Sequence, residues 1–447
     1  MFRSCQLSFI PCGGACRPVA RGLRPVDATR PAGDGGCRSA RGGTQMNHAS
    51  DMDRHSSVDL SDPDLYATGD PEQVWARLRA QAPVHRTERA AGAFWSVLSH
   101  EVISQVLRDA RTFSSRHGMR LDHNPAASAA AADKMLIVTD PPRHGRIRGI
   151  INSAFTPRMV RRLEENMRVT AAAALDGALA AGSCDFTEVA ARLPVATICD
   201  MLGVPREDWD FMLSRTMVAF GADGGTDGMA VAEAHVEILS YYEELLELRR
   251  DDPQDDIVTA LAHAEVDGVP LTDEEIFLNC DGLISGGNET TRHATVGGLL
   301  ALLDNPGQWQ VLRDDPGLIP SAVQEILRYT SPAMHVLRTA TTDTVLGGHS
   351  IAAGDQIALW LPSGNRDEAV FAEPERFDVR RSPNRHLTFA TGTHFCLGAS
   401  LATTELTVLF DELTRRVDAV QPDGPVRRMR SNLIWGFESA PVTLTAR

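Results

Sequence analysis

The chain has 447 residues, and its 59 acidic residues outnumber 44 basic ones, which gives a formal net charge of −15. An acidic surface of this size argues against nucleic acid as the main partner. No run of the sequence reaches the roughly 18 apolar residues that a membrane-spanning helix needs, and the cysteines after residue 180 are scattered, which favours reduced thiols. We therefore expect a cytoplasmic enzyme with a small-molecule ligand.

The first 57 residues are rich in Arg, Gly and Pro and contain few large apolar side chains. A segment of this composition cannot bury enough apolar surface to fold. We predict a disordered leader at residues 1–57 and a catalytic domain at residues 58–447. A start site assigned too far upstream, with Met46 or Met52 as the true beginning, is the preferred explanation, and a transit peptide is the alternative.

Beyond residue 60 the pattern is mostly helical. Asp70 followed by Pro71 predicts a helix N-cap and first turn, and residues 94–98 are typical of a short strand. Residues 115–137, which include an alanine run, predict a loop. Several helices follow up to about residue 303, and further strands are predicted at 344–346, 356–360 and 441–444. The sequence thus predicts a mainly-α fold with a minority of short β-strands.

The segment 389–398 holds one cysteine, Cys396, between two glycines. A helical pattern begins at Leu397, so Cys396 lies near a helix N-terminus, where the dipole and free backbone N–H groups favour a thiolate. Glycines also let the backbone pass close to a flat ligand. A buried structural cysteine is the alternative that these residues alone leave open.

This segment resembles the heme-binding signature of the cytochrome P450 family. The resemblance rests on Phe389, Gly392, His394, Cys396 and Gly398. It implies heme b (iron protoporphyrin IX) as the cofactor and Cys396 as the axial ligand of its iron. One departure is the alanine at position 390, where the family usually has glycine or serine; we expect it to shift the loop packing slightly.

The segment 285–291 lies in a long helical pattern that runs from about residue 272 to 303. Gly286 and Gly287 each cost a helix about 1 kcal/mol relative to alanine, so a packing crossing or a ligand must justify them. The segment resembles the family's distal helix, in which these small residues lie against the heme and leave room for O2. Glu289 and Thr290 then supply the catalytic acid and hydroxyl.

Two further matches concern charged residues. Glu325 and Arg328 are spaced to pair on one helix face; the resemblance implies that the pair is buried and that Arg376 completes it as a structural triad. His144 and Arg148 face the same way on a helix that opens after two prolines. By the same resemblance these two side chains bind the heme propionates.

Two more propionate partners follow from the same comparison, Arg338 and His394. The whole resemblance extends from about residue 60 to the end of the chain. It implies the triangular-prism fold of the family and links this chain to its soluble bacterial, actinobacterial class.

The implied activity is that of a monooxygenase, which inserts one atom of O2 into a C–H bond and releases the other as water. No flavin or nicotinamide segment is present, so electrons from NAD(P)H must arrive through a ferredoxin and its reductase, docking on the Cys396 side. The substrate is expected to be medium-sized and largely apolar, and it can be bound to a carrier protein. Its predicted pocket residues are Leu283, Met334, His335, Val336, Trp435 and Phe437.

Several alternatives stay open. Natural-product tailoring is favoured over the hydroxylation of steroids, lipids or terpenes. A peroxide-driven enzyme is the next candidate, but such relatives tend to lack the pair formed here by Glu289 and Thr290. A non-catalytic heme-thiolate protein is disfavoured because the catalytic motifs are intact.

Overall fold

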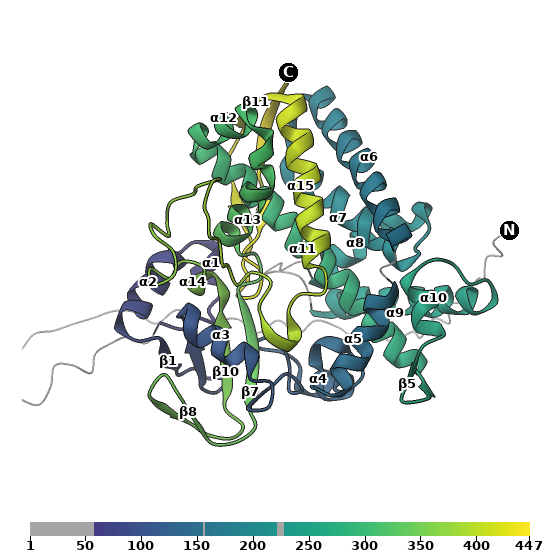
Figure 1. Cartoon of the computed structure of the whole chain (residues 1–447), viewed down its shortest axis with the longest axis vertical. Coiled ribbons are helices and arrows are strands. Elements are labelled where there is room, and N and C mark those ends of the chain that lie inside the picture. The colour runs from purple at the N-terminus through teal and green to yellow at the C-terminus, as the bar shows by residue number, and fades with distance from the viewer. Residues whose placement is uncertain (1–57, 155–156, 221–227) are drawn as a thin grey trace, which may run out of the picture. The chain divides into compact units, whose positions relative to one another are not determined.

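The computed structural model describes residues 58–154, 157–220 and 228–447. The predicted leader at 1–57 lies outside the described residues. Helices dominate the described part of the chain and short strands make up the rest (Figure 1). The predicted mainly-α fold with a minority of strands is therefore confirmed.

The helices account for most of the chain between residues 64 and 416. Their bounds are α1 Asp64–Ala67, α2 Pro71–Gln81, α3 His100–Arg108, α4 Pro125–Ala131, α5 Arg143–Ala154, α6 Pro157–Ala181, α7 Phe186–Leu202, α8 Trp209–Phe220, α9 Gly228–Asp251, α10 Ile257–Ala262, α11 Asp273–Asp304, α12 Pro306–Asp314, α13 Ile319–Thr330, α14 Leu361–Gly364 and α15 Ala399–Arg416.

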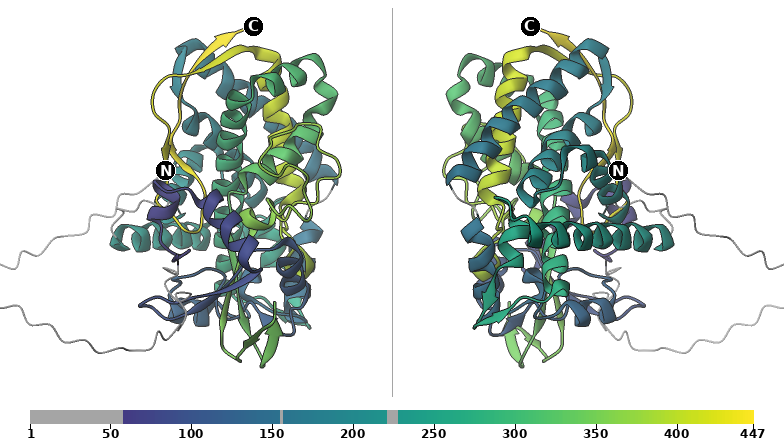
Figure 2. Two further views of the ribbon diagram at one scale, coloured as in Figure 1. Left: turned by 90° about the vertical axis from the view of Figure 1, so that its left-hand side faces the viewer. Right: turned by 90° about the vertical axis from the view of Figure 1, so that its right-hand side faces the viewer.

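The largest sheet joins two distant parts of the chain. Its strand order is β1 Val84–Thr87, β2 Phe94–Val97, β10 Gln356–Trp360, β7 His335–Ala340 and β3 Phe113–Ser114. Strands β2 and β10 pair in parallel, with Trp95 opposite Ile357, and β10 and β7 pair antiparallel, with Ile357 opposite Arg338. In the views of Figure 1 and Figure 2, β7 and β10 lie in the lower part of residues 58–447 with α3 and α4 beside them, and α6, α12 and α15 lie in the upper part.

The remaining strands form small sheets. β4 Ser183–Asp185, β11 Val417–Pro422 and β14 Pro441–Ala446 make a three-stranded sheet in the order β11-β14-β4. Three hairpin-like pairs complete the set: β5 Glu265–Val266 with β6 Val269–Pro270, β8 Thr344–Leu346 with β9 His349–Ile351, and β12 Arg427–Arg428 with β13 Phe437–Ser439.

The long helix α11 passes through the helical region and contacts α7, α9, α13 and α15. It starts at a capping box, in which the Thr272 side chain accepts from the Glu275 N–H and the Glu275 carboxylate accepts from the Thr272 N–H. The box satisfies two otherwise unpaired donors at the helix start. Because other helices surround α11, most of its residues are buried.

Most predicted elements are present. The helix after Asp70 is α2, the strand at 94–98 is β2, and the three later strands are β8, β10 and β14. The predicted loop at 115–137 needs a correction, because its alanine run forms α4. Asn124 caps that helix by accepting from the Ala126 and Ala127 N–H groups, and alanine has the highest helix propensity of all residues.

Among the described residues, no helix is both long and apolar enough to cross a bilayer.

Candidate active site

The loop before Cys396 is fixed by backbone contacts. The Cys396 N–H donates to the Phe389 carbonyl over 2.9 Å. Gly392 has φ +75°, and a Cβ at this position would lie 2.3 Å from the Leu107 carbonyl oxygen at the end of α3. Only glycine permits so close an approach in this conformation. The predicted role of Gly392 in the loop thus has a steric reason. The alanine at 390 also adopts a positive φ, +55°, which explains why glycine suits that position.

The Cys396 thiol is partly buried just before α15. Burial raises its pKa, although the Gly398 N–H and the positive charge of Arg148 act in the opposite direction. The expected thiolate therefore does not arise from the helix terminus alone. Coordination to a metal ion would deprotonate the thiol outright. The aromatic ring of Phe389 packs edge-on against Phe395 in the same loop.

Four basic side chains predicted to bind propionates come from separate elements. His144 and Arg148 lie on α5, Arg338 on β7, and His394 in a single 3-10 turn at Gly392–His394. The ring centroids of His144 and His394 are 4.1 Å apart. The structure thus brings together residues that are up to 250 positions apart in the sequence.

These four side chains, His144, Arg148, Arg338 and His394, form a basic cluster in which burial lowers the pKa values of three members, and mutual repulsion adds to this at the two histidines. Burial, followed by the charge of Arg148, lowers the pKa of His144 to about 4. Burial and the charge of Arg338 lower the pKa of His394 to about 3. Burial also lowers the pKa of Arg338 to about 10.

These side chains fit a dianionic ligand. Among the described residues, neither ring nitrogen of His144 has a hydrogen-bond partner, and the buried Arg338 guanidinium donates to the Leu337 carbonyl alone. Buried donors without partners are costly. Two propionate carboxylates would satisfy them, so the residues present fit a heme held by Cys396 and by the basic cluster. A bound heme would supply the activation of O2.

Helix α11 exposes a small patch formed by Gly286 and Thr290. Residues 288–299 are otherwise buried, but Thr290 is partly exposed and Gly286 is exposed. The Thr290 hydroxyl donates to the Gly286 carbonyl over 2.9 Å, and a Cβ on Gly286 would meet nothing within 4 Å. Open space therefore lies beside α11 at this point, as predicted for these two residues. Leu283, one turn earlier, is also partly exposed.

Gly287 lies close to α7. A Cβ added there would lie 3.1 Å from Cδ1 of Ile198 on that helix. The crossing of α11 with α7 thus gives this glycine a structural reason, and its contact with the cofactor stays a prediction.

Glu289 points away from the open patch. Its carboxylate is 2% exposed and lies 3.1 Å from Nε2 of His293 and 3.3 Å from Nη1 of Arg292. Burial alone would raise its pKa, but the hydrogen bond from His293 and the charge of Arg292 hold that pKa below its ordinary value. The carboxylate of the predicted catalytic acid is thus paired inside the protein.

The third member of the buried ion pair is Arg381 and not Arg376. Glu325 and Arg328 are both 0% exposed and 2.8 Å apart, as predicted. Arg381 Nε lies 3.1 Å from the Glu325 carboxylate, whereas Arg376 is 56% exposed and pairs with Glu373. Arg328 does reach the Arg376 backbone carbonyl, so the predicted segment is correct and the side chain is wrong.

Three of the predicted pocket residues belong to the hydrophobic core, and a fourth, His335, is a buried polar residue. Met334 and Trp435 pack in one core cluster with Trp75 and Trp360, and Phe437 belongs to the main helical core. His335 is 1% exposed, and its ring nitrogens bond to the Leu121 N–H and the Asn432 carbonyl. Side chains alternate along β7, so Val336 shares the face of Arg338 while His335 points to the other side.

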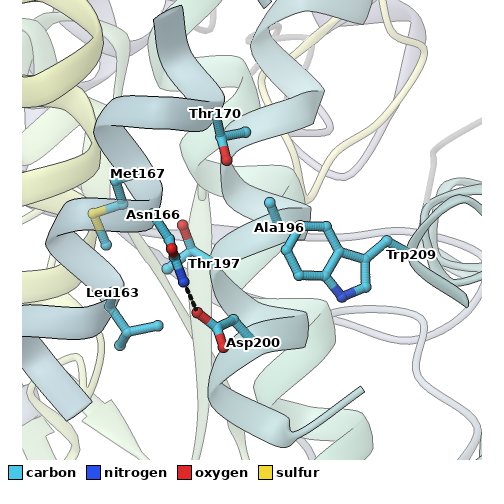
Figure 3. Close-up of a pocket in the computed structure, with 8 residues that line it drawn as sticks. All are labelled: Leu163, Asn166, Met167, Thr170, Ala196, Thr197, Asp200 and Trp209. Atoms are coloured by element: carbon cyan, nitrogen blue, oxygen red, sulfur yellow. Dashed lines mark hydrogen bonds between the residues drawn. The ribbon is translucent and has the colours of Figure 1, made fainter. Parts of the chain in front are cut away.

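A separate hollow lies between α6, α7 and Trp209 (Figure 3). Its residues are Leu163, Asn166, Met167, Thr170, Ala196, Thr197, Asp200 and Trp209. The Asn166 amide donates to the Asp200 carboxylate over 2.7 Å. None of the predicted site residues lines this hollow.

Comparison with known proteins identifies the architecture. The family model for cytochrome P450 matches residues 317–437. Putative cytochrome P450 126 of Mycobacterium tuberculosis is 40% identical, over 87% of this chain and 98% of the relative. Cytochrome P450 NovI of Streptomyces niveus is 36% identical, over 87% of this chain and 96% of its own length.

A solved structure supports the same family assignment. The crystal structure of P450 OxyD, a protein involved in the biosynthesis of vancomycin-type antibiotics, matches with a TM-score of 0.81 and 37% identity, over 87% of this chain and 100% of that one. The predicted fold is thereby confirmed. With relatives aligned over almost their whole lengths, the chain belongs to the cytochrome P450 family and is a heme-thiolate monooxygenase.

Proposed function

We propose that the open patch at Gly286 and Thr290 is where this monooxygenase handles O2 and protons. The supporting observation is that Thr290 is accessible on a helix whose neighbouring residues are buried. For each O2, the reaction consumes two electrons and two protons, places one oxygen atom in a C–H bond and releases the other as water. The Thr290 hydroxyl can hold a proton-donating water in this space, and Glu289 supplies the carboxylate that exchanges the proton.

The experiment compares two threonine variants. Thr290→Ala should still bind heme and oxidise NADH with a surrogate ferredoxin system, but it should release more hydrogen peroxide per NADH. Thr295→Ala is the matched control, because Thr295 makes the same type of bond, to the Thr291 carbonyl over 2.9 Å, within the core. Wild-type peroxide yield in Thr290→Ala would defeat the proposal.

For the substrate, we propose a medium-sized, largely apolar natural product that is hydroxylated as a tailoring step. The substrate can be free or attached to a carrier protein. The similar protein OxyD supports this choice through its involvement in the biosynthesis of vancomycin-type antibiotics. A similar structure, P450BioI, was solved with a fatty acid attached to an acyl carrier protein.

Hydroxylation of a steroid, lipid or terpene is the second candidate. It is supported by a steroid C26-monooxygenase of Mycobacterium tuberculosis at 36% identity and by a linalool 8-monooxygenase of Pseudomonas putida at 36% identity. A binding screen separates the two. Steroids, methyl-branched fatty acids, terpene alcohols and a set of carrier-linked natural-product precursors would each be titrated while the Soret band is recorded. A shift with only the first three classes would contradict the tailoring role.

Electrons must come from outside the chain, because monooxygenases of this family depend on a redox partner. We propose a ferredoxin with its NAD(P)H-dependent reductase, acting in the cytoplasm and docking on the Cys396 side. NADH oxidation that saturates with added ferredoxin would support this partner, and activity driven only by peroxide would exclude it.

A further inference from the structure

His293 forms a hydrogen-bonded link between α11 and the segment from the end of β12 to the start of β13 (residues 429–437), called the C-terminal turn below. Its ring is 0% exposed. One ring nitrogen, Nδ1, accepts from the Phe437 backbone N–H over 3.2 Å. The other, Nε2, lies 3.1 Å from the Glu289 carboxylate. A single buried ring therefore contacts both the predicted catalytic acid and the backbone of residue 437.

These two contacts determine the tautomer of the ring. A backbone N–H can only donate, so Nδ1 must be the acceptor. The proton of a neutral imidazole then lies on Nε2 and is donated to Glu289. Burial lowers the pKa of His293, which agrees with a neutral ring beside an ionised carboxylate. Every ring nitrogen has a partner suited to this one arrangement.

The turn fits closely over the ring. A Cβ added to Gly436 would lie 2.8 Å from Nε2 and Cδ2 of His293, and 2.5 Å from the Met429 sulfur. Two positively charged side chains lie near the two partners of His293. Arg292 Nη1 lies 3.3 and 3.4 Å from the two Glu289 oxygens, and the Arg428 guanidinium lies 4.9 Å from the Phe437 ring centre.

We propose that His293 is a positioning residue that holds Glu289 in a retracted position, on the side of α11 away from Thr290, and ties that position to the C-terminal turn. The inference rests on the proposed role of Glu289 in proton supply. Glu289 then reaches the open patch only when its bond to His293 is broken, and the strength of this bond limits proton delivery.

The first test measures the coupling between the two residues without relying on turnover. His293→Leu, Glu289→Gln and the double variant would be unfolded thermally as heme-loaded full-length proteins between pH 5 and pH 8. The pKa of Glu289 lies below its ordinary 4.5 in the folded state, so the stability that its carboxylate contributes is present at both ends of this pH range. The pKa of His293 is lowered from 6.5, so the buried neutral ring contributes stability that the wild type loses as the pH falls below about 6.5. We therefore expect His293→Leu to lose several degrees of Tm at pH 8 and less at pH 5.

In the Glu289→Gln background the loss of Tm at pH 8 should be smaller, because the ionised acceptor of the His293 Nε2–H is absent. His293→Gln should recover part of the loss, since its amide can both donate and accept. His335→Leu is the control: this equally buried histidine also has two hydrogen bonds, to Leu121 and Asn432. Its effect on Tm should be alike in both backgrounds. An equal loss of Tm for His293→Leu at pH 8 with and without Glu289 would overturn the inference.

The second test addresses proton delivery and separates the two proposals. Peroxide per NADH would be measured against pH in His293→Leu, and we expect its inflection to move to higher pH by about one unit, the typical spread of protein pKa values. One outcome is a Tm effect of His293→Leu that depends on Glu289, together with an unchanged peroxide profile. It would support the positioning by His293 and refute the proton role of Glu289. No coupling in the Tm data would refute the positioning itself.

Discussion

The Nε atom of Arg381 lies 3.1 Å from each carboxylate oxygen of Glu325. Arg328 approaches the same carboxylate from within its own helix, and Asn384 donates to it from the following loop. Arg381 also donates to the backbone carbonyls of residues 372, 373 and 376. It therefore fastens the segment before the cysteine loop to α13.

Replacement of Arg381 by alanine should destabilise the protein. Glu325 keeps Arg328 as a partner, so we expect a loss of about 1–3 kcal/mol, the usual cost of an unmet buried polar group, together with lower heme retention. Urea unfolding and heme content would be measured. Arg376→Ala is the control, and because the Arg376 side chain is exposed its loss should stay below about 1 kcal/mol. Equal effects of the two variants would reject the assignment.

Substitution of Gly392 tests the loop geometry. Gly392→Ala places a methyl group against the Leu107 carbonyl in a left-handed conformation, which should cost at least about 1 kcal/mol and reduce heme incorporation. Gly177→Ala should do the opposite. Gly177 lies inside α6 with nothing near its Cβ position, so alanine should stabilise the helix by about 0.5–1 kcal/mol. A stable, fully heme-loaded Gly392→Ala variant would contradict the steric argument.

Cys396 should determine the spectrum of the reduced, carbon-monoxide-bound protein. We expect the red-shifted Soret band that a thiolate ligand produces. In Cys396→His the band should move to the position of imidazole-ligated heme. Cys199→Ser, at a free thiol buried in α7, should leave the band in place. If Cys396→His gave the wild-type spectrum, a different residue would be the ligand.

Glu405 should make the stability of the fold depend on pH. Burial raises its pKa from 4.5 to about 8, despite hydrogen bonds with Thr197 and Thr291. The unfolded chain ionises first as the pH rises, so the stability contributed by this group is complete below about pH 4.5 and is lost towards pH 8.

Glu405→Gln removes this titration. The free energy of unfolding of the wild type, relative to Glu405→Gln, should fall by up to about 1.4 kcal/mol for each pH unit in this range. Chemical unfolding at pH 5, 6.5 and 8 would measure it. Glu412→Gln is the control, because Glu412 lies on the same helix in a surface pair with Arg416. Parallel pH curves for wild type and Glu405→Gln would show that Glu405 is ionised in the fold.

Local sequence patterns predicted the parts of the site that depend on one segment. The cysteine loop, the glycine and threonine on α11, and the Glu325–Arg328 pair each lie within a few residues, and their spacing already places them on one face or in one turn. The basic cluster followed from family resemblance, and the structure brings its members together as expected.

The errors concern contacts between distant segments. Arg376 and Arg381 lie in one loop, and only the folded path of that loop decides which arginine turns inward. No local pattern shows that Gly287 faces Ile198 or that His293 meets Phe437. Family resemblance places Trp435 in the pocket, but its ring packs edge-on against Trp75 in the core.

The pairing of β2 with β10 has a consequence for biosynthesis. Trp95 meets Ile357, and the basic cluster needs His144 together with Arg338 and His394, so neither can form while the C-terminal half is still on the ribosome. At about 5–20 residues per second, the first helices wait on the order of tens of seconds for their partners. Contacts of such long sequence separation also form slowly. Cofactor capture is therefore an event that follows chain release, and the yield of loaded protein depends on the heme supply at that moment.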